Sequence, residues 1–180
     1  PVRLCIGNHD RRTNFLSVFP DHDGPGGFAH GVHDTAAGRC LFLDTVEPET
    51  HAGRFCDGLQ QWLEARLSEH PGPFLLFMHH NPMPVGIWAA DVLSLADGEA
   101  LRGILREYRD VVRHIFFGHT HYSLSGALEG IAFSAPRSTN HPLWPELGER
   151  RRFGYGPIAP NYNLALVTNG TVVVHTIDFM

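Results

Sequence analysis

The fold is indicated most clearly by residues 74–82, which have the sequence Phe-Leu-Leu-Phe-Met-His-His-Asn-Pro. The first five of these residues form a continuous apolar run, which is typical of a strand that is covered on both faces. His79 and His80 follow the run directly. Polar groups on the loops after strands build the sites of open α/β sheets. This stretch therefore predicts a buried strand with a functional loop at its end.

Two further stretches repeat this arrangement. Residues 7–10 (Gly-Asn-His-Asp) follow an apolar run at 2–6, and residues 118–121 (Gly-His-Thr-His) follow one at 111–117. Together the three stretches offer one amide oxygen, five imidazoles and a carboxylate at strand ends. Neutral imidazole is the commonest protein ligand of transition metals. The sequence therefore predicts a transition-metal site of the kind that hydrolases use.

The grouping of the histidines matters more than their number. A single histidine is interpreted as a hydrogen-bonded core or loop residue, whereas three histidine-bearing stretches behind separate strands favour a site. His119 and His121 are two residues apart, so on a tight loop they can point at two neighbouring metals. Two metals about 3.5–4 Å apart can clamp a phosphate and activate a bridging hydroxide.

Length and composition exclude several classes of function. A chain of 180 residues with 43% hydrophobic and 18% charged residues fits a globular enzyme of one domain. The net charge of -5 offers no basic surface, so we expect neither nucleic acid nor a membrane as partner. The one basic run, at 149–152, is interpreted as solvated surface. No run is long enough to span a bilayer, and no signal peptide is visible.

The cysteines indicate a reducing compartment. Cys5, Cys40 and Cys56 are an odd number and show no Cys-x-x-Cys spacing. Two of them lie in or beside apolar runs, where a free cysteine behaves as a small hydrophobe. Because no disulfide framework is implied, we expect a cytoplasmic protein.

The remaining pattern predicts strands that alternate with helices and then an antiparallel end. Helices are expected at 57–69, with Asp57 as N-cap, and at 97–109. Asn169-Gly170 predicts a type I′ hairpin turn. Residues 11–38 are expected to form a long loop with one helical turn near Phe15. Strands are expected at 2–6, 39–43, 74–78, 111–117, 131–134, 164–168 and 172–177, and irregular chain at 83–96, apart from a short helical piece, and at 136–163.

With its three stretches in this order and spacing, the chain resembles the calcineurin-like metallophosphoesterase superfamily. The family pattern is Asp-x-His, Gly-Asp, Gly-Asn-His-(Asp/Glu), a His often followed by x-Pro, and Gly-His-x-His. The last three parts are present here, and the resemblance covers roughly residues 1–140. Five shorter stretches resemble the class III branch, which includes bacterial cyclic-nucleotide and glycerophosphodiester phosphodiesterases; they are residues 43–45, 50–53, 61–63, 77–80 and 134–141.

The resemblance implies a set of metal ligands. Asn8, His79 and His119 would bind the second metal of a two-metal centre, and His121 would bind the first. Mixed nitrogen and oxygen ligation suits a divalent transition metal, namely Mn, Fe, Zn or Co.

The resemblance also implies roles around these ligands. His9 would lie near the phosphate and would stabilise charge or protonate the leaving alkoxide. Asp10 would orient His9 rather than bind metal. His80 is a candidate near the site, with a purely structural role equally open.

The implied fold is α/β with mixed sheets, a partial four-layer αββα sandwich from which the N-terminal strands are missing. Residues 1–180 would then be a single domain, the C-terminal portion of the family fold. Neither Asp-x-His nor Gly-Asp occurs anywhere in the chain, which excludes circular permutation. These parts would supply two ligands of the first metal and the bridging carboxylate. Without them the first metal keeps only His121 and the second keeps three neutral ligands, so this chain would bind one metal or none where the family binds two.

The expected function is metal-dependent hydrolysis of small phosphodiesters, of the cyclic nucleotide or glycerophosphodiester type, by a metal-activated hydroxide. The alternative is a catalytically impaired remnant that binds at most one metal and phosphate. A nuclease or protein phosphatase shares the three motifs, but the low count of Lys and Arg, 14 in all, argues against a large nucleic acid. A metallo-β-lactamase-type enzyme would need His-x-His-x-Asp-His, and residues 122–124 do not provide it.

An oligomer is expected as well. The strand predicted at 2–6 would lack a neighbour and would expose an edge, which invites pairing with another chain. We therefore expect a homodimer or a larger homo-oligomer, or else a longer protein of which this chain is a piece.

Overall fold

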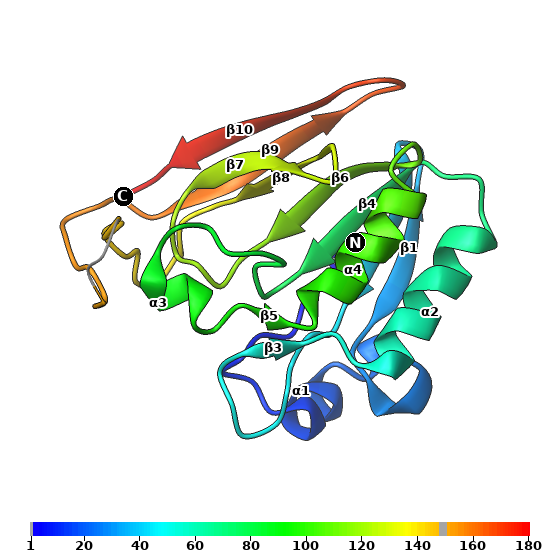
Figure 1. The fold of residues 1–180 in the computed structure, drawn as a ribbon, viewed down its shortest axis with the longest axis horizontal. Helices are drawn as coiled ribbons and strands as arrows, with labels where there is room; N and C mark the ends of the chain where they lie inside the picture. Colours follow the sequence, from blue (N-terminus) through cyan, green and yellow to red (C-terminus); the bar gives the residue numbers. More distant parts are fainter. Residues whose placement is uncertain (1, 148–150) are drawn as a thin grey trace.

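A six-stranded mixed sheet is the centre of the computed structural model, which describes residues 2–147 and 151–180 (Figure 1). Its strand order is β1-β2-β4-β6-β8-β7, and the four inner strands run parallel while both edge strands run antiparallel. The mixed α/β class is therefore confirmed. The strands are β1 (Gly31–Thr35), β2 (Gly38–Leu43), β4 (Phe74–Met78), β6 (Val112–Phe117), β7 (Leu124–Leu128) and β8 (Ile131–Ala135).

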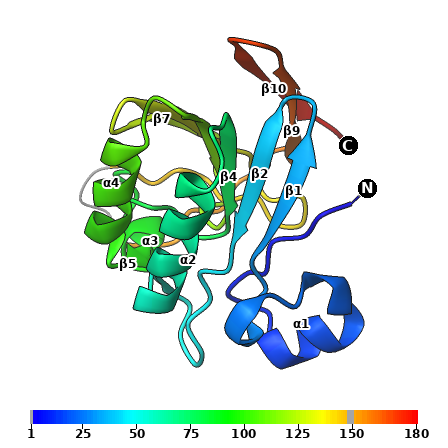
Figure 2. The same ribbon diagram turned by 90° about the vertical axis from the view of Figure 1, so that its right-hand side faces the viewer.

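Two helices, α2 (Asp57–Ser68) and α4 (Gly98–Glu107), cover one face of this sheet (Figure 2). Both helices carry apolar side chains at three-four spacing, and that side faces the sheet in the main core. The first helix begins differently from the prediction, because Cys56 is the N-cap and Asp57 lies inside the first turn. The fully buried leucines of this core include Leu59, Leu63, Leu101 and Leu105 from the helices and Leu41 and Leu76 from the strands.

A hairpin of β9 (Asn161–Val167) and β10 (Val172–Asp178) lies on the other side of the sheet from these helices (Figures 1 and 2). The predicted hairpin is present, but its turn at Asn169-Gly170 is not of type I′, because that type needs a positive φ at both central residues and only Gly170, at 149°, has one. Asn161 ties the base of the hairpin to the main sheet: its side chain donates to Ser123 Oγ at 2.9 Å and accepts from the Arg137 N–H at 2.7 Å. Helices, main sheet and hairpin thus follow the α, β, β order of the predicted sandwich.

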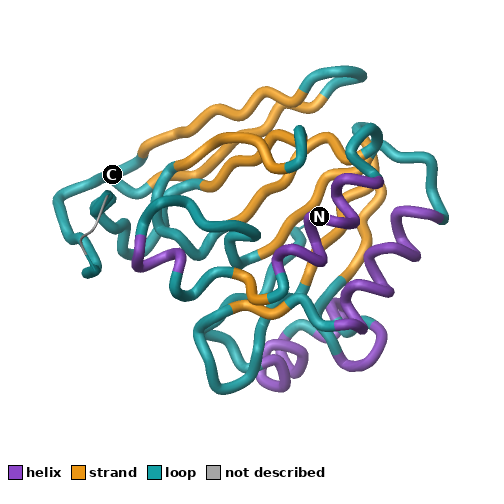
Figure 3. Tube along the Cα trace, in the orientation of Figure 1, coloured by secondary structure: helices purple, strands orange, loops and turns teal. Residues whose placement is uncertain are grey.

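The connections hold the shorter elements (Figure 3). Among the described residues, the chain between β8 and β9 contains no helix or strand, as predicted. Residues 149 and 150 of the basic run lie outside the described residues. None of the described helices is long and apolar enough to cross a membrane. The shorter elements are α1 (Arg12–Val18), the 3-10 turns Pro20–His22 and Pro25–Gly27, β3 (Gly53–Arg54), α3 (Trp88–Asp91) and β5 (Leu95–Ala96).

The strand predicted at residues 2–6 is wrong. A strand needs ladder hydrogen bonds from a partner, and among the described residues no strand pairs with this segment. The Leu4 N–H instead donates to His22 Nε2 at 3.1 Å. Ile6 is buried with Ala29 and Val46 in a small separate cluster. The oligomer was predicted from the exposed edge of this strand. Because the strand does not form, that reason no longer applies, and the oligomer stays a prediction.

Two strands of the main sheet were missing from the predicted pattern, as were the short strands β3 and β5. Gly31–Thr35 lies within the expected loop at 11–38 but pairs with β2 as the edge strand β1. Leu124–Leu128 contains serine, glycine and alanine at exposed positions, so its alternation is faint. It forms a hairpin with β8 because Glu129 and Gly130 adopt φ values of 53° and 85°. Such a left-handed pair makes a tight turn without the usual Asn-Gly signature.

Candidate metal centre

The histidines of the predicted site lie at the carboxyl ends of two neighbouring strands. β4 and β6 are parallel, with Met78 opposite Phe117. The Gly118 N–H extends the pairing by one step and donates to the His79 carbonyl at 3.0 Å. His79 and His119 therefore leave the sheet at the same edge and side by side. This is the crevice in which open α/β sheets place their ligands.

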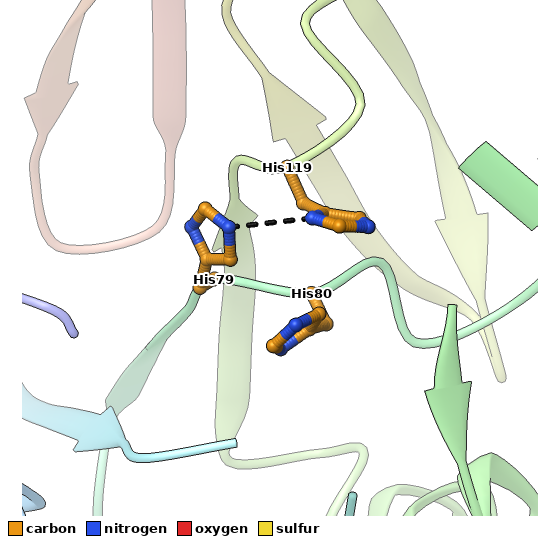
Figure 4. Close-up of side chains that lie close together, drawn as sticks. All are labelled: His79, His80 and His119. Carbon is orange, nitrogen blue, oxygen red and sulfur yellow. Dashed lines mark hydrogen bonds between the residues drawn. The ribbon is translucent and has the colours of Figure 1, made fainter. Parts of the chain in front are cut away.

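Three side chains of this edge converge on one point. His79 Nε2 lies 2.8 Å from Asn8 Oδ1 and 3.3 Å from His119 Nδ1 (Figure 4). The ligand atoms of His79, His80 and His119 all lie within 4.8 Å of one another. The structure thus brings the amide oxygen of the Gly-Asn-His-Asp loop onto the imidazoles of the other two stretches.

His80 belongs to this cluster rather than to the core alone. Its side chain is fully buried, and its Nδ1 lies 2.7 Å from Thr45 Oγ1. Among the described residues, its Nε2 has no hydrogen-bond partner. A buried polar atom without a hydrogen-bond partner destabilises the folded protein by about 1–3 kcal/mol. A bound cation at this nitrogen would offset that cost. Three imidazoles and an amide oxygen form a neutral donor set that fits one transition metal.

Burial keeps these imidazoles uncharged. Loss of solvent lowers the pKa of His79 to about 2, of His80 to about 3 and of His119 to about 4, and neighbouring imidazoles lower each further. A neutral ring keeps the lone pair that a metal needs, whereas an imidazolium has none to offer. At neutral pH the cluster is therefore ready to bind a cation.

Local backbone geometry serves the same cluster. A Cβ at Gly7 would lie 2.9 Å from the His79 ring, and one at Gly53 would lie 2.4 Å from His80 Cγ. Only glycine lets these two loops approach the histidines so closely. His119 and His121 adopt φ values of 63° and 58°. Non-glycine residues in this region are strained by about 1–3 kcal/mol, and such strain gathers at functional sites.

His121 points elsewhere. It lies outside the compact group, its Nδ1 is 3.0 Å from the His141 carbonyl oxygen, and its ring centroid is 4.3 Å from that of His141. The compact group contains no carboxylate among the described residues. The structure therefore assembles donors for one metal and leaves His121 as a single donor beside them.

The other predicted residues of the first stretch lie at the surface of this group. His9 is exposed, and its ring centroid is 5.0 Å from that of His51. The carboxylate of Asp10 accepts the Gly7 N–H at 2.9 Å and so closes the turn of its own loop. Its described hydrogen bond therefore shapes the loop that carries His9 and does not reach the His9 ring.

Two histidines near the centre were not predicted as site residues. His51 Nδ1 lies 3.2 Å from Asn8 Nδ2, which orients the amide oxygen toward His79. His141 packs on His121 from the loop after β8. Both lie in irregular chain without periodicity, in stretches 50–53 and 134–141. The likeness of those stretches to one branch of the family was the signal that could have found them.

A buried ion pair holds the first loop against the sheet. Arg12 donates to both carboxylate oxygens of Asp44, at 2.6 and 3.0 Å, and to the Val46 carbonyl at 2.7 Å. The Ala29 N–H completes the set at 2.8 Å. Asp44 directly follows β2, so this network fixes the start of α1, and with it the Asn8 loop, beside the carboxyl end of the sheet.

Two recesses adjoin the centre. The smaller, of about 290 Å³, is lined by imidazoles and by the apolar residues Ala89, Ala90 and Leu93, and we call it the site recess. The larger, of about 670 Å³, lies between α1 and the loop at 46–51. Asn8 and His51 line both.

A cluster of imidazoles at the carboxyl ends of parallel strands is an arrangement that could hold a metal ion, as in many hydrolases. The calcineurin-like phosphoesterase family matches residues 1–123, and the chain belongs to this family. The resemblance inferred from the three motifs is therefore confirmed.

Several curated relatives share the whole chain or much of it. A protein of Rhodopseudomonas palustris named "Probable cyclic nucleotide phosphodiesterase" is 31% identical over 100% of this chain and 67% of its own length. One of the same description from Rhodococcus erythropolis is 33% identical over 96% of this chain and 56% of its own. The glycerophosphodiester phosphodiesterase GpdQ of Enterobacter lignolyticus is 32% identical over 67% of this chain and 45% of its own. The chain thus spans about half to two thirds of these relatives.

A solved structure shares the fold. A dimetal phosphatase of Danio rerio superposes with a TM-score of 0.57, at 20% identity, over 76% of this chain and 60% of that one. This likeness supports the order of sheet and helices described above.

Proposed function

We propose that this chain carries the site of a metal-dependent phosphodiesterase that hydrolyses small phosphodiesters of the cyclic nucleotide or glycerophosphodiester type. The observation that carries the proposal is the convergence of Asn8, His79 and His119 beside the exposed His9. Relatives with both kinds of name align with the chain. The recess beside the imidazoles, at about 290 Å³, suits a small molecule rather than a polymer.

Asn8, His79 and His119 would hold one divalent metal, Mn, Fe, Zn or Co, with His80 Nε2 as a further donor. His121 would serve a second metal. When bound, the metal supplies Lewis-acid polarisation of the phosphoryl group. The chain's own contribution is a rigid and neutral donor set, because the hydrogen bond of His51 fixes the Asn8 amide and burial keeps the imidazoles uncharged.

His9 would act on the substrate itself. His9 is exposed and lines the site recess together with Asn8 and His119, but it lies outside the compact donor group. There it can donate a hydrogen bond to a phosphoryl oxygen or a proton to the leaving alkoxide. Asp10 supports this role indirectly, since it fixes the turn that presents His9.

One observation favours the alternative, a remnant that binds one metal and phosphate without turnover. His121 lies apart from the donor set, and that set holds no carboxylate among the described residues. A set of neutral ligands alone holds a metal less tightly than a set with a carboxylate. A cytoplasmic location and a homo-oligomer stay predictions, as does a single domain over 1–180.

The deciding experiment measures metal content by mass spectrometry and turnover of bis(p-nitrophenyl) phosphate with added Mn²⁺ on the same sample. Bound metal with turnover supports the enzyme, and one metal without turnover supports the remnant. Asn8→Ala should lower the metal content. His175→Ala is the matched control, because His175 is an exposed histidine on β10. Unchanged metal content in Asn8→Ala would sink the ligand assignment.

A further inference from the structure

Two exposed aromatic rings stand at the mouth of the site recess. Phe153 is 45% exposed and Tyr155 is 80% exposed, and both line the recess that His9 and His121 also line. Large apolar side chains on a surface are unremarkable when scattered singly, but a group that borders a polar crevice marks a binding site. Neither ring takes part in holding a metal, so the metal site does not account for them.

The segment that carries these rings is anchored rather than free. The Trp144 N–H donates to the Gly154 carbonyl at 3.0 Å, and the two residues form an isolated β-bridge. A Cβ at Gly154 would lie 2.1 Å from the Trp144 carbonyl oxygen, and one at Gly156 would lie 2.6 Å from the Trp144 ring. Glycine on both sides of Tyr155 therefore lets the segment pack tightly on Trp144 and leaves the tyrosine ring outside.

The second ring has an anchor of its own. The Phe153 ring meets the Trp88 ring of α3 edge-on, with centroids 6.4 Å apart. Such edge-to-face pairs contribute about 0.5–1.5 kcal/mol beyond their buried area. Phe153 is thus held beside the helix that forms the apolar wall of the recess.

The wall itself is small and flat. Ala89 and Ala90 are buried residues of α3 that line the recess with methyl groups only, and Leu93 continues the wall. Ala90 packs with Ile87, Tyr122 and Leu143 in a small core, which keeps the wall in place. The recess is therefore lined by imidazoles, by small apolar groups and by two aromatic side chains that remain exposed.

This combination matches one kind of ligand. A nucleotide joins a phosphate to a planar heteroaromatic ring through a single ribose, so a phosphate beside His9 puts the ring within the same recess. Every base has a π-face that can stack on phenylalanine or tyrosine, and such stacking contributes about 1–3 kcal/mol per base. A glycerol arm has no π-face and gains nothing from exposed aromatic rings.

We propose that Phe153 and Tyr155 form a stacking platform for a nucleobase, so that the site selects nucleotide-type phosphodiesters over glycerophosphodiesters. This inference rests on the proposed phosphate site for the other end of the ligand. Because stacking is tolerant of base identity, the platform distinguishes nucleotides from other diesters rather than one purine from another.

The test compares ligands with and without a base. With the Mn²⁺-loaded chain, calorimetry measures the Kd of adenosine 5′-monophosphate and of ribose 5-phosphate. We expect the nucleotide to bind at least about tenfold more tightly, and Phe153→Ala and Tyr155→Ala each to reduce that ratio by about fivefold or more. Tyr155→Phe keeps the π-face and should keep the ratio. Tyr162→Ala is the matched control, because Tyr162 is 48% exposed on the hairpin.

Adenosine and ribose, without phosphate, separate this inference from the proposed function. If neither inorganic phosphate nor ribose 5-phosphate binds and no diester is hydrolysed, the proposed function is wrong. Even then, tighter binding of adenosine than of ribose, removed by Tyr155→Ala, would support the stacking platform. Equal binding of adenosine and ribose, or a ratio unchanged in both alanine variants, would overturn it. Tyr155 is so exposed that its replacement leaves folding intact, so the test holds even if Phe153→Ala unfolds.

Discussion

The two halves of the candidate site are built from the same residue type but have opposite surroundings. His79, His80 and His119 lie behind parallel strands, lose their solvent and share donor atoms within 4.8 Å of one another. His9 and His51 lie on loops, remain exposed and contact each other only through rings 5.0 Å apart. The first half suits a site that holds a cation, and the second suits one that meets a substrate. The comparison shows that burial, rather than residue type, determines which of these histidines suit a cation and which suit a substrate.

The largest expected effect concerns the exposed half. His9→Ala should lower the turnover of bis(p-nitrophenyl) phosphate by about 10²–10⁴-fold, the usual contribution of a positioned acid or base, and leave the metal content unchanged. Steady-state kinetics with parallel mass spectrometry of the metal measures both. Loss of metal in this variant would mean that the two halves are not separate, and His175→Ala provides the baseline.

The next effect concerns the link between the halves. Asp44→Ala leaves Arg12 without the carboxylate that it contacts at 2.6 Å, and removing one partner of a buried pair costs about 3–5 kcal/mol. Urea denaturation should show this loss in the free energy of unfolding. Asp34→Ala removes a pair with Arg39 whose carboxylate is mostly exposed, and it serves as the control. Equal midpoints for the two variants would contradict the role assigned to the buried pair.

A third effect tests the boundary within Gly-His-Thr-His. His119→Ala should weaken Mn²⁺ binding at least about 100-fold, since even the outer partners of metal ligands cost 10–100-fold when removed. His121→Ala should weaken it much less, because His121 lies outside the donor group and faces His141. Calorimetric titration of both variants measures the difference. Equal losses would place His121 in the same metal site.

The sequence predicted the buried half better than the exposed half for a physical reason. A strand such as β4 is marked by five apolar residues in a row, and its register alone carries His79 to the edge of the sheet. His51 and His141 lie on loops that are fixed by single contacts from distant parts of the chain, such as the 3.2 Å contact between His51 and Asn8. Periodicity in one sequence contains no trace of such contacts.

The strand predicted at residues 2–6 was wrong for a related reason. Its apolar pattern suits a strand, but local pattern specifies a strand only when a partner supplies the ladder, and here Leu4 bonds to a histidine ring instead. The opposite error was made for β7, which was not predicted because its alternation is weak. It is a strand nevertheless, because it pairs with β8 through the turn at Glu129-Gly130. Strand existence thus depends on the neighbour as much as on the residues themselves.

The smallest effect separates the halves by pH, in the protein without metal. The folded-state pKa values of His79, His80 and His119 are lowered to about 2, 3 and 4, while the unfolded chain titrates near 6.5. Below pH 6.5 the unfolded state binds more protons, so stability is complete above this pH and is lost as the pH falls, down to about 4 for His119 and further for His80 and His79. One such group gives the free energy of unfolding a slope of about 1.4 kcal/mol per pH unit.

His119→Gln should flatten this slope, measured by urea denaturation between pH 4 and 6.5, and His175→Gln should not. A slope unchanged by His119→Gln would mean that the ring is protonated in the folded protein. The buried histidines would then not be held in the neutral form that a metal needs.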